Sequence, residues 1–317
     1  MQEVGAQNSE TQGLETNPWA AIEDKPDPLI PTATLQIYQH IDATLTRPKD
    51  THINRASSAS LCYKRRWFQG KGVVGTPLTP RKQVNFLLGD LSERTTLHFI
   101  KEGCVGPGKL YSEVDFGEKT GEIHFQGKTL SIYKQQDLVA QIGPLTVTAH
   151  ADGWGKRNSD GEWELIEVKS YSNYGFDDFK TKGAKDYLKQ STVNLQTTKA
   201  KELGAKSVRF FGLRKETGHL WDRRFEFDPA LAFIVEAEYL AALADEEPKT
   251  PYQPVAETFR KKPTGRMILP FPCNGYCPYT EKCFSNFTID WKAGQFGQKT
   301  PVYVVTQENS DAVQTAS

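Results

Sequence analysis

The spacing of the cysteines constrains this chain more than any other feature. Three of the five, Cys273, Cys277 and Cys283, fall within eleven residues near the end, whereas Cys62 and Cys104 lie in the first third. A single cysteine is usually a small buried hydrophobe, but three so close together, spaced Cys-x3-Cys-x5-Cys, indicate metal ligands. Structural zinc sites and iron–sulfur clusters commonly take four ligands of this kind. Cys62 is the candidate for the fourth, and a shared site would tie the two ends of the chain together.

The start and the composition of the chain indicate a reducing compartment. The first residues, MQEVGAQNSETQGLETNP, have no positive region followed by an apolar one, so they do not read as a secretory signal. No stretch approaches the length of a membrane span. We therefore predict a cytoplasmic protein with no membrane segment, in which disulfides are rare. Lys plus Arg (39) balance Asp plus Glu (39), so any contact with nucleic acid has to come from local patches.

The pattern of apolar residues predicts an α/β fold built around one sheet. We expect helices near 32–45, 57–68, 83–101, 184–203 and 230–244, and strands near 110–116, 122–125, 130–133, 145–151, 163–168, 208–213 and 220–227. The chain then divides into a polar tail, an N-terminal helical segment, a core, a cysteine-rich segment and a second tail, at 1–30, 31–105, 106–245, 246–300 and 301–317.

Two of the expected strands carry an acidic constellation. Asp152 directly follows the strand at 145–151, and Glu167-Val168-Lys169 lies on the strand at 163–168 and just beyond it. Alternate residues of a strand share a face, so Glu167 and Lys169 point one way and Val168 points into the core. If Asp152 ends beside them, two carboxylates and an ammonium converge. Mg²⁺ prefers such oxygen ligands and can activate a phosphate ester. Taken alone, these residues are equally typical of a half-exposed strand and a tight turn.

Neighbouring residues extend this constellation. Glu93, on the helix before the strands, either supplies a third carboxylate or forms a surface ion pair. His150 shares a strand face with Asp152, where it contacts the metal or the phosphate, or makes a structural hydrogen bond. Gln190 and Asn194 share one face of a lysine-rich helix. That face suits contact with a phosphate backbone, or is simply solvated.

The order of these motifs resembles that of the RecB-like iron–sulfur nucleases, which have a PD-(D/E)XK catalytic core and include CRISPR-associated adaptation exonucleases and related phage proteins. The matching motifs, in chain order, are Cys62 with Arg65 and Arg66, Gly89, Asp152, Glu167-Val168-Lys169, Gln190, and Cys273, Cys277 and Cys283. Several independent motifs in one order are more specific than any single motif. The chain departs from the family pattern at Glu93, where a histidine is frequent, and at Asn194, where a tyrosine is expected.

The resemblance implies a restriction-endonuclease-like core, a mixed sheet flanked by helices. A 4Fe-4S cluster would join the N- and C-terminal segments, and its implied ligands are Cys62, Cys273, Cys277 and Cys283. Cys104 is left without a role.

The resemblance further implies a Mg²⁺- or Mn²⁺-dependent exonuclease that acts on DNA, preferably single-stranded or with free ends. The implied catalytic residues are Asp152, Glu167 and Lys169, and the implied metal-binding residues are Glu93, Asp152, Glu167 and Val168. Contacts with DNA are expected from Arg65, Arg66, Lys185, Lys189 and Gln190. Two alternatives remain: a DNA-end-binding module without catalysis, and a zinc–cysteine protein of unrelated activity.

Overall fold

The structure, a computed structural model, divides by its internal contacts into two compact units, Met1–Thr46 and Arg47–Ser317. In the first unit, Gln36, Ile37 and His40 are described and are helical. The remainder of the helix expected at 32–45 lies outside the described residues. Across the whole chain the structure describes residues 36–37, 40, 54–76, 80–259, 262–270, 273–274, 277–284, 287–293 and 299–305.

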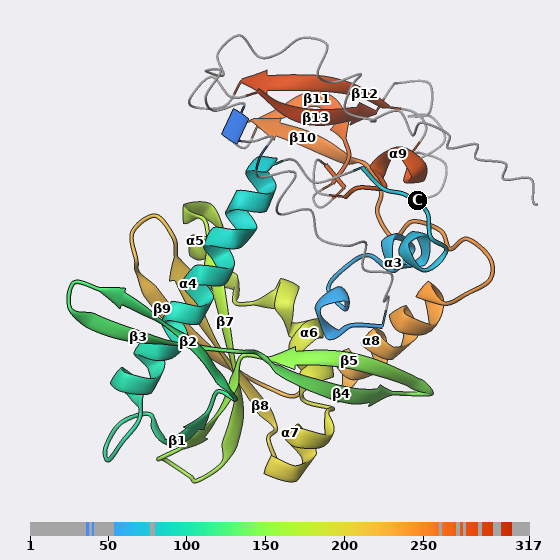
Figure 1. The fold of residues 1–317 in the computed structure, drawn as a ribbon. Coiled ribbons are helices and arrows are strands. Elements are labelled where there is room, and N and C mark those ends of the chain that lie inside the picture. Colours follow the sequence, from blue (N-terminus) through green and yellow to red (C-terminus); the bar gives the residue numbers. More distant parts are fainter. Residues whose placement is uncertain are drawn as a thin grey trace, which may run out of the picture. The chain divides into compact units, whose positions relative to one another are not determined.

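In its described residues, the second unit combines helices with strands (Figure 1). Its helices are η1 (Ala56–Ser58), α3 (Tyr63–Gly70), α4 (Pro80–Cys104), α5 (Asn173–Lys182), α6 (Lys185–Asn194), α7 (Thr198–Leu203), α8 (Pro229–Ala242) and α9 (Thr280–Cys283). Its strands are β1 (Tyr111–Asp115), β2 (Lys119–Phe125), β3 (Lys128–Tyr133), β4 (Gln136–Ile142), β5 (Leu145–Ala151), β6 (Gly153–Arg157), β7 (Trp163–Tyr171), β8 (Ser207–Arg214), β9 (Leu220–Glu226), β10 (Val255–Phe259), β11 (Lys262–Ile268), β12 (Phe287–Ala293) and β13 (Lys299–Val305). Among the described residues, no helix is both long and apolar enough to span a bilayer.

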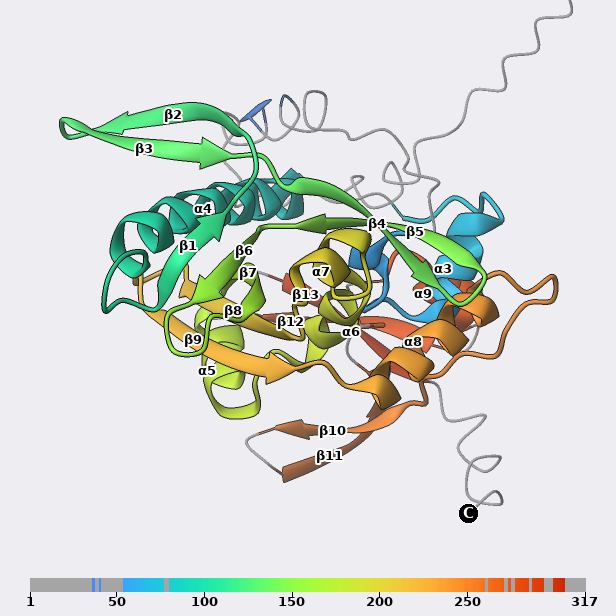
Figure 2. The same ribbon diagram turned by 90° about the horizontal axis from the view of Figure 1, so that it is seen from below.

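The central sheet is mixed and has five strands in the order β1-β6-β7-β8-β9. Strands β7 and β8 run parallel, and the other neighbouring pairs are antiparallel. A four-stranded sheet, β10-β11-β13-β12, and the hairpins β2–β3 and β4–β5 complete the set (Figure 2). A mixed sheet flanked by helices was predicted from the sequence and is confirmed.

Strand β7 joins the two halves of the core because its successive side chains enter opposite layers. Ile166 and Val168, both fully buried, pack with Leu97 and Ile100 of α4. Leu165, on the other face, belongs to a second cluster to which α5, α6 and α7 contribute. Helix α4 therefore covers one face of β7, while α5 and α6 cover the other.

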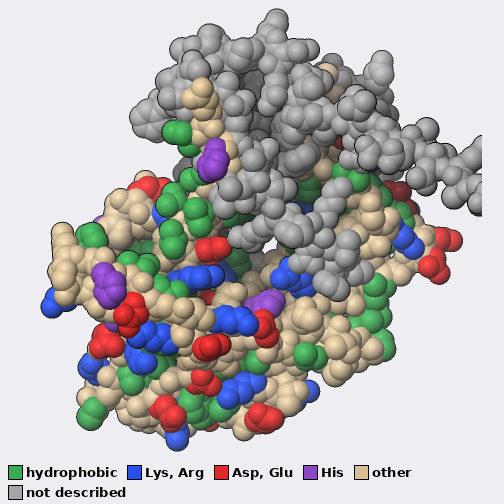
Figure 3. All heavy atoms as spheres, viewed as in Figure 1, with side chains coloured by type: hydrophobic (Ala, Val, Ile, Leu, Met, Phe, Trp, Pro, Cys, Tyr) green, Lys and Arg blue, Asp and Glu red, His purple; other side chains and the backbone are tan. Residues whose placement is uncertain are grey.

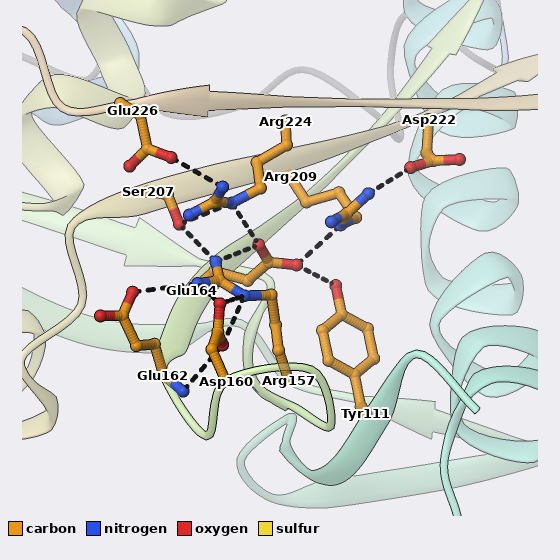
Figure 4. A network of polar contacts seen from close by, with 10 residues as sticks. All are labelled: Tyr111, Arg157, Asp160, Glu162, Glu164, Ser207, Arg209, Asp222, Arg224 and Glu226. Atoms are coloured by element: carbon orange, nitrogen blue, oxygen red, sulfur yellow. Dashed lines mark hydrogen bonds and ion pairs between the residues drawn. The ribbon is translucent and has the colours of Figure 1, made fainter. Parts of the chain in front are cut away.

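A buried ion network fixes the start of β7 (Figure 4). The carboxylate of Glu164 has no exposed surface and contacts Arg157 at 3.1 Å, Arg209 at 2.7 Å and Arg224 at 3.1 Å. The hydroxyl of Tyr111 also donates to it, at 2.8 Å. Strands β1, β6, β8 and β9 are thereby all tied to one carboxylate at the beginning of the central strand.

Three expectations about the elements were wrong. The helix expected at 184–203 is two helices, because the Thr197 side chain accepts a hydrogen bond from the backbone of Ala200 and starts α7 anew. The segment 246–269, expected to be a loop, contains β10 and β11. The tail expected at 301–317 begins inside β13, which pairs with β12 from Phe287 to Ala293. These strands pair mostly as hairpins, β10 with β11 and β12 with β13, and Ile268↔Val304 joins the two hairpins into one sheet.

Candidate active site

Asp152 lies between β5 and β6 and is held at both carboxylate oxygens. Its Oδ2 accepts from the backbone N–H of Val168 at 2.8 Å, and its Oδ1 accepts from the side chain of Gln135 at 2.6 Å. The β6–β7 ladder ends at the pair of Gly153 and Ile166. Beyond this pair, the Asp152 side chain accepts the hydrogen bond from the Val168 N–H in place of a backbone partner on β6. A side chain at Gly153 would overlap the ring of Phe116. The glycine therefore allows the Phe116 ring to pack directly against the backbone of β6 next to Asp152.

Glu167 and Lys169 project from one face of β7 toward α6. The Lys169 ammonium lies 2.9 Å from Glu167 Oε2 and 5.5 Å from the centre of the Tyr187 ring. The other oxygen of Glu167 accepts from the side chain of Asn194, the last residue of α6, at 2.6 Å. The two side chains are therefore neighbours, as the alternation of the strand predicts.

Glu93 reaches the same end of β7 from α4. Its Oε1 accepts from the backbone N–H of Ser170 at 3.3 Å. One turn earlier on the helix, a Cβ at Gly89 would lie 3.1 Å from the Ser170 hydroxyl. The absence of a side chain at Gly89 thus permits the close approach of α4 to β7 that brings Glu93 within electrostatic reach of Asp152 and Lys169.

The electrostatics of this cluster follow from burial and mutual repulsion. Burial raises the pKa of Glu167 to about 7, and the charge of Asp152 adds to this against the opposing effects of Lys169 and Asn194. Burial also raises the pKa of Glu93 to about 7, again opposed by Lys169 and reinforced by Asp152. Although burial by itself lowers the pKa of Lys169, the three carboxylates together raise it above its ordinary value. The cluster thus holds more negative charge than its single ammonium neutralises.

The three carboxylates are better explained as ligands of a hard divalent cation than as side chains with no bound cation. Buried carboxylates of like charge destabilise one another unless a cation or a proton joins them. Asp152, Glu167 and Glu93 offer the oxygen ligands that Mg²⁺ and Mn²⁺ prefer. In the described part of the chain, no three His, Cys, Asp or Glu side chains already surround one point as a ligand set. Their oxygens are instead turned to Gln135 and the other protein donors named above.

His150, at the end of β5, makes a structural contact. Its Nδ1 lies 2.9 Å from the carboxylate of Asp137, its partner across the β4–β5 hairpin. Its backbone oxygen accepts from the side chain of Asn194 at 3.1 Å. The hydrogen-bonding alternative therefore describes the imidazole in this structure, two residues before Asp152.

The residues expected to contact DNA do not form one surface. Arg66 is fully buried, with its guanidinium 4.4 Å from the centre of the Tyr239 ring and 3.7 Å from Glu238 on α8. The expected DNA contact was therefore wrong for Arg66, because α3 turns it inward against α8. The ammonium of Lys189 is also paired with Glu238.

Two other members of that set stay compatible with an outer contact. Arg65 and Gln190 are partly exposed on α3 and α6. Lys185 begins α6, and its side chain lies outside the described residues. Over the described part of the face shown in Figure 3, Lys and Arg side chains are interspersed with Asp and Glu, and no continuous basic stripe crosses it.

The cysteine-rich segment packs against the segment that contains Cys62. The Phe68 and Tyr279 rings stack with centres 5.3 Å apart, and the backbone N–H of Thr76 donates to the carbonyl of Pro278 at 2.8 Å. The Thr280 hydroxyl donates to the carbonyls of Cys273 and Cys277 at 2.7 and 3.1 Å, which ties both cysteines to the start of α9. The segment from α3 to Thr76 is therefore in contact with the segment that leads into α9.

The thiols of this region influence one another. Burial, together with the neighbouring thiols of Cys277, Cys62 and Cys283, raises the pKa of Cys273 to about 12. Burial also raises the pKa of Cys283, to about 11, with smaller contributions from Cys277 and Cys62 and with Lys64 opposing. For Cys104, the charged neighbours are instead Asp222, Lys109 and Arg209. Four thiols thus share one neighbourhood, and Cys104 stands apart from it.

The sequence did not predict the roles of two residues of the site, Gln135 and Asn194. Gln135, which binds Asp152, lies between two hairpins and belongs to no motif. For Asn194, a departure from the family pattern, the sequence predicts a helix face that contacts a phosphate backbone or solvent, yet the residue is fully buried. A polar residue at the end of an amphipathic helix was the available signal for Asn194. Nothing local marks Gln135.

Comparisons with known proteins give weak similarities. No family model matches the sequence, and no curated protein is significantly similar to it. Similar solved structures include SSO0001, with a TM-score of 0.37, 12% identity, and coverage of 68% of this chain and 89% of that one. They also include an alkaline exonuclease, LHK-Exo from Laribacter hongkongensis, at 0.35 and 17%, covering 65% and 90%. LHK-Exo in complex with dAMP scores 0.32 at 18% identity, covering 60% and 89%. These values do not place the chain in a family.

Proposed function

We propose that this protein is a Mg²⁺- or Mn²⁺-dependent deoxyribonuclease with a PD-(D/E)XK core, and that it digests DNA from the ends of single strands. The observation that carries the proposal is the meeting of Asp152, Glu167, Lys169 and Glu93 at one end of β7. The Asp152 carboxylate binds the N–H of Val168, between the other two catalytic candidates on the strand. Four side chains from a loop, a strand and a helix thereby reach one small region.

Each residue of the cluster has a distinct task in this proposal. Asp152, Glu167 and Glu93 would hold the cation with their carboxylates, and Val168, the residue between Glu167 and Lys169, with its backbone carbonyl oxygen. When bound, the cation polarises a phosphoryl oxygen and lowers the pKa of a water molecule. Lys169 stays charged in the presence of the carboxylates. Its ammonium is therefore available to offset the negative charge that develops on the phosphate, or to orient the attacking water.

The proposal includes a 4Fe-4S cluster bound by Cys62, Cys273, Cys277 and Cys283. Its support is the shared electrostatic neighbourhood of the four thiols and the packing of α3 against the α9 region. Metal binding that exists only in the folded state adds to folding free energy. The cluster would therefore act as a clamp between segments more than two hundred residues apart in the chain.

Cleavage of labelled DNA tests the nuclease directly. Purified protein is incubated with end-labelled single- and double-stranded DNA in Mg²⁺, in Mn²⁺ and in chelator. We expect cation-dependent cleavage that Asp152→Asn and Lys169→Ala abolish while DNA binding persists. Binding without cleavage by the wild-type protein in either cation would favour the accessory-module alternative. A colourless protein containing zinc and no iron would refute the 4Fe-4S cluster.

A further inference from the structure

The environment of Asn194 suggests a role that the sequence did not. Asn194 ends α6 and has no exposed surface. Its side-chain Nδ2 donates to Glu167 Oε1 at 2.6 Å and to the backbone oxygen of His150 at 3.1 Å. His150 precedes Asp152 by two residues. One amide thus connects the strand that leads to Asp152 with the strand that carries Glu167.

The orientation of this amide is determined by its partners. The carbonyl oxygen of His150 can only accept a hydrogen bond, so the NH₂ group of Asn194 has to face it. The backbone of Asn194 is fixed as well, because the buried hydroxyl of Thr197 donates to its carbonyl oxygen at 2.7 Å. Asn194 therefore presents a donor, and not an acceptor, to Glu167.

The arrangement does not serve stability alone. Asn194 Oδ1 is buried and has no hydrogen-bond partner among the described residues. A buried polar atom left unpaired costs folding free energy. An apolar residue at this position would avoid that cost but would leave Glu167 free to rotate about its side-chain bonds. Locally unfavourable choices of this kind are expected at functional sites.

We propose that Asn194 is a positioning residue that fixes the carboxylate of Glu167 for cation binding beside Asp152. The proposal rests on the proposed function, because it assigns Asn194 to the same cation site. With Lys169 at one oxygen of Glu167 and Asn194 at the other, the carboxylate has a single orientation before the cation arrives. Residues that orient metal ligands in this way contribute strongly to metal affinity.

Stabilisation by Mn²⁺ tests the proposal without using activity. The thermal midpoint of the full-length protein is followed against Mn²⁺ for wild type, Asn194→Leu and Asn194→Ala. Leucine keeps the branched shape of asparagine without its hydrogen-bonding groups, and alanine covers the case in which the larger leucine prevents folding. We expect both variants to need about ten times more Mn²⁺ than wild type for the same rise in the thermal midpoint. An unchanged Mn²⁺ requirement in a folded variant would overturn the proposal.

Asn158 provides the matched control. Its Nδ2 also bridges two backbone carbonyls, those of Gly106 and Lys109, at 2.8 and 2.9 Å, and neither acceptor belongs to the acidic cluster. Asn158→Ala is expected to lower the thermal midpoint and to leave the Mn²⁺ requirement unchanged. An equal rise in the Mn²⁺ requirement for Asn158→Ala would mean that general loosening explains the Asn194 effect, and would overturn the proposal.

A double-mutant cycle separates this proposal from the proposed function. Asn194→Ala and Glu167→Gln are combined, and midpoints are measured without added metal. We expect the two effects to be non-additive, since the residues share a hydrogen bond. Additive effects would refute the positioning contact whatever the protein does. A wild-type protein that Mn²⁺ does not stabilise would instead refute the cation site.

Discussion

Glu93→Gln should stabilise the metal-free protein and weaken its response to metal. Burial raises the pKa of Glu93 from about 4.5 to about 7. Between these values the folded protein holds a proton that the unfolded chain has lost, so the stability linked to this group falls as pH rises through 7. The pKa difference corresponds to about 3 kcal/mol, which partial solvent exposure reduces to about 2 kcal/mol. Glutamine has the same shape and no charge to bury.

Thermal unfolding at pH 8 and pH 5 measures this difference. At pH 8 without metal, Glu93→Gln should raise the midpoint by about 4 °C, and at pH 5 the difference should shrink toward zero. Saturating Mn²⁺ should reverse the order, because Mn²⁺ at 100 times its Kd adds about 2.7 kcal/mol to a protein that binds it. Glu102→Gln, at an exposed position of the same helix, should change neither value. A lower midpoint at pH 8, or a difference independent of pH, would refute the reasoning.

Three further predictions concern the cation site, the network and the thiols. Because the pKa values of Glu93 and Glu167 are both about 7, protons compete with the cation, and Mn²⁺ affinity measured by calorimetry should fall as pH drops below 7; a constant affinity from pH 8 to pH 5.5 would exclude these ligands. Glu164→Leu leaves three arginines without their shared carboxylate and should cost about 3 kcal/mol in urea unfolding, a loss under 1 kcal/mol being the contrary result. Cys62→Ala should remove iron and visible absorbance and lower the thermal midpoint, whereas Cys104→Ala should keep all three; the reverse pattern would move the fourth ligand to Cys104.

The central part of the site follows from strand periodicity. In Glu167-Val168-Lys169, alternation places the middle residue in the core, and Val168 is fully buried there. The same alternation brings Glu167 and Lys169 together at 2.9 Å. Such features are local, since the period of a strand is fixed by its backbone. The burial of Glu167 is not local, because it depends on α6 covering that face.

Tertiary packing also explains the positions that the sequence predicted wrongly or not at all. Arg65 and Arg66 read as one cationic pair, yet adjacent residues on a helix point in different directions. Arg66 lies one turn after Cys62 and packs on α8, where Tyr239 stacks with it. Gln135, in the link between β3 and β4, donates to Asp152, which lies seventeen residues later in the chain. Tertiary packing decided each of these positions, and no pattern in the sequence records it.

Digestion of linear and circular single-stranded DNA tests the central claim most directly. Wild-type protein and Glu167→Gln are compared in Mn²⁺ at pH 8, with chelator as the blank. We predict that wild type degrades the linear strand to short products and spares the circle, that Glu167→Gln degrades neither, and that chelator stops the reaction. Wild-type protein that leaves the linear strand intact in Mn²⁺ and in Mg²⁺, or Glu167→Gln that digests it at the wild-type rate, would contradict the account.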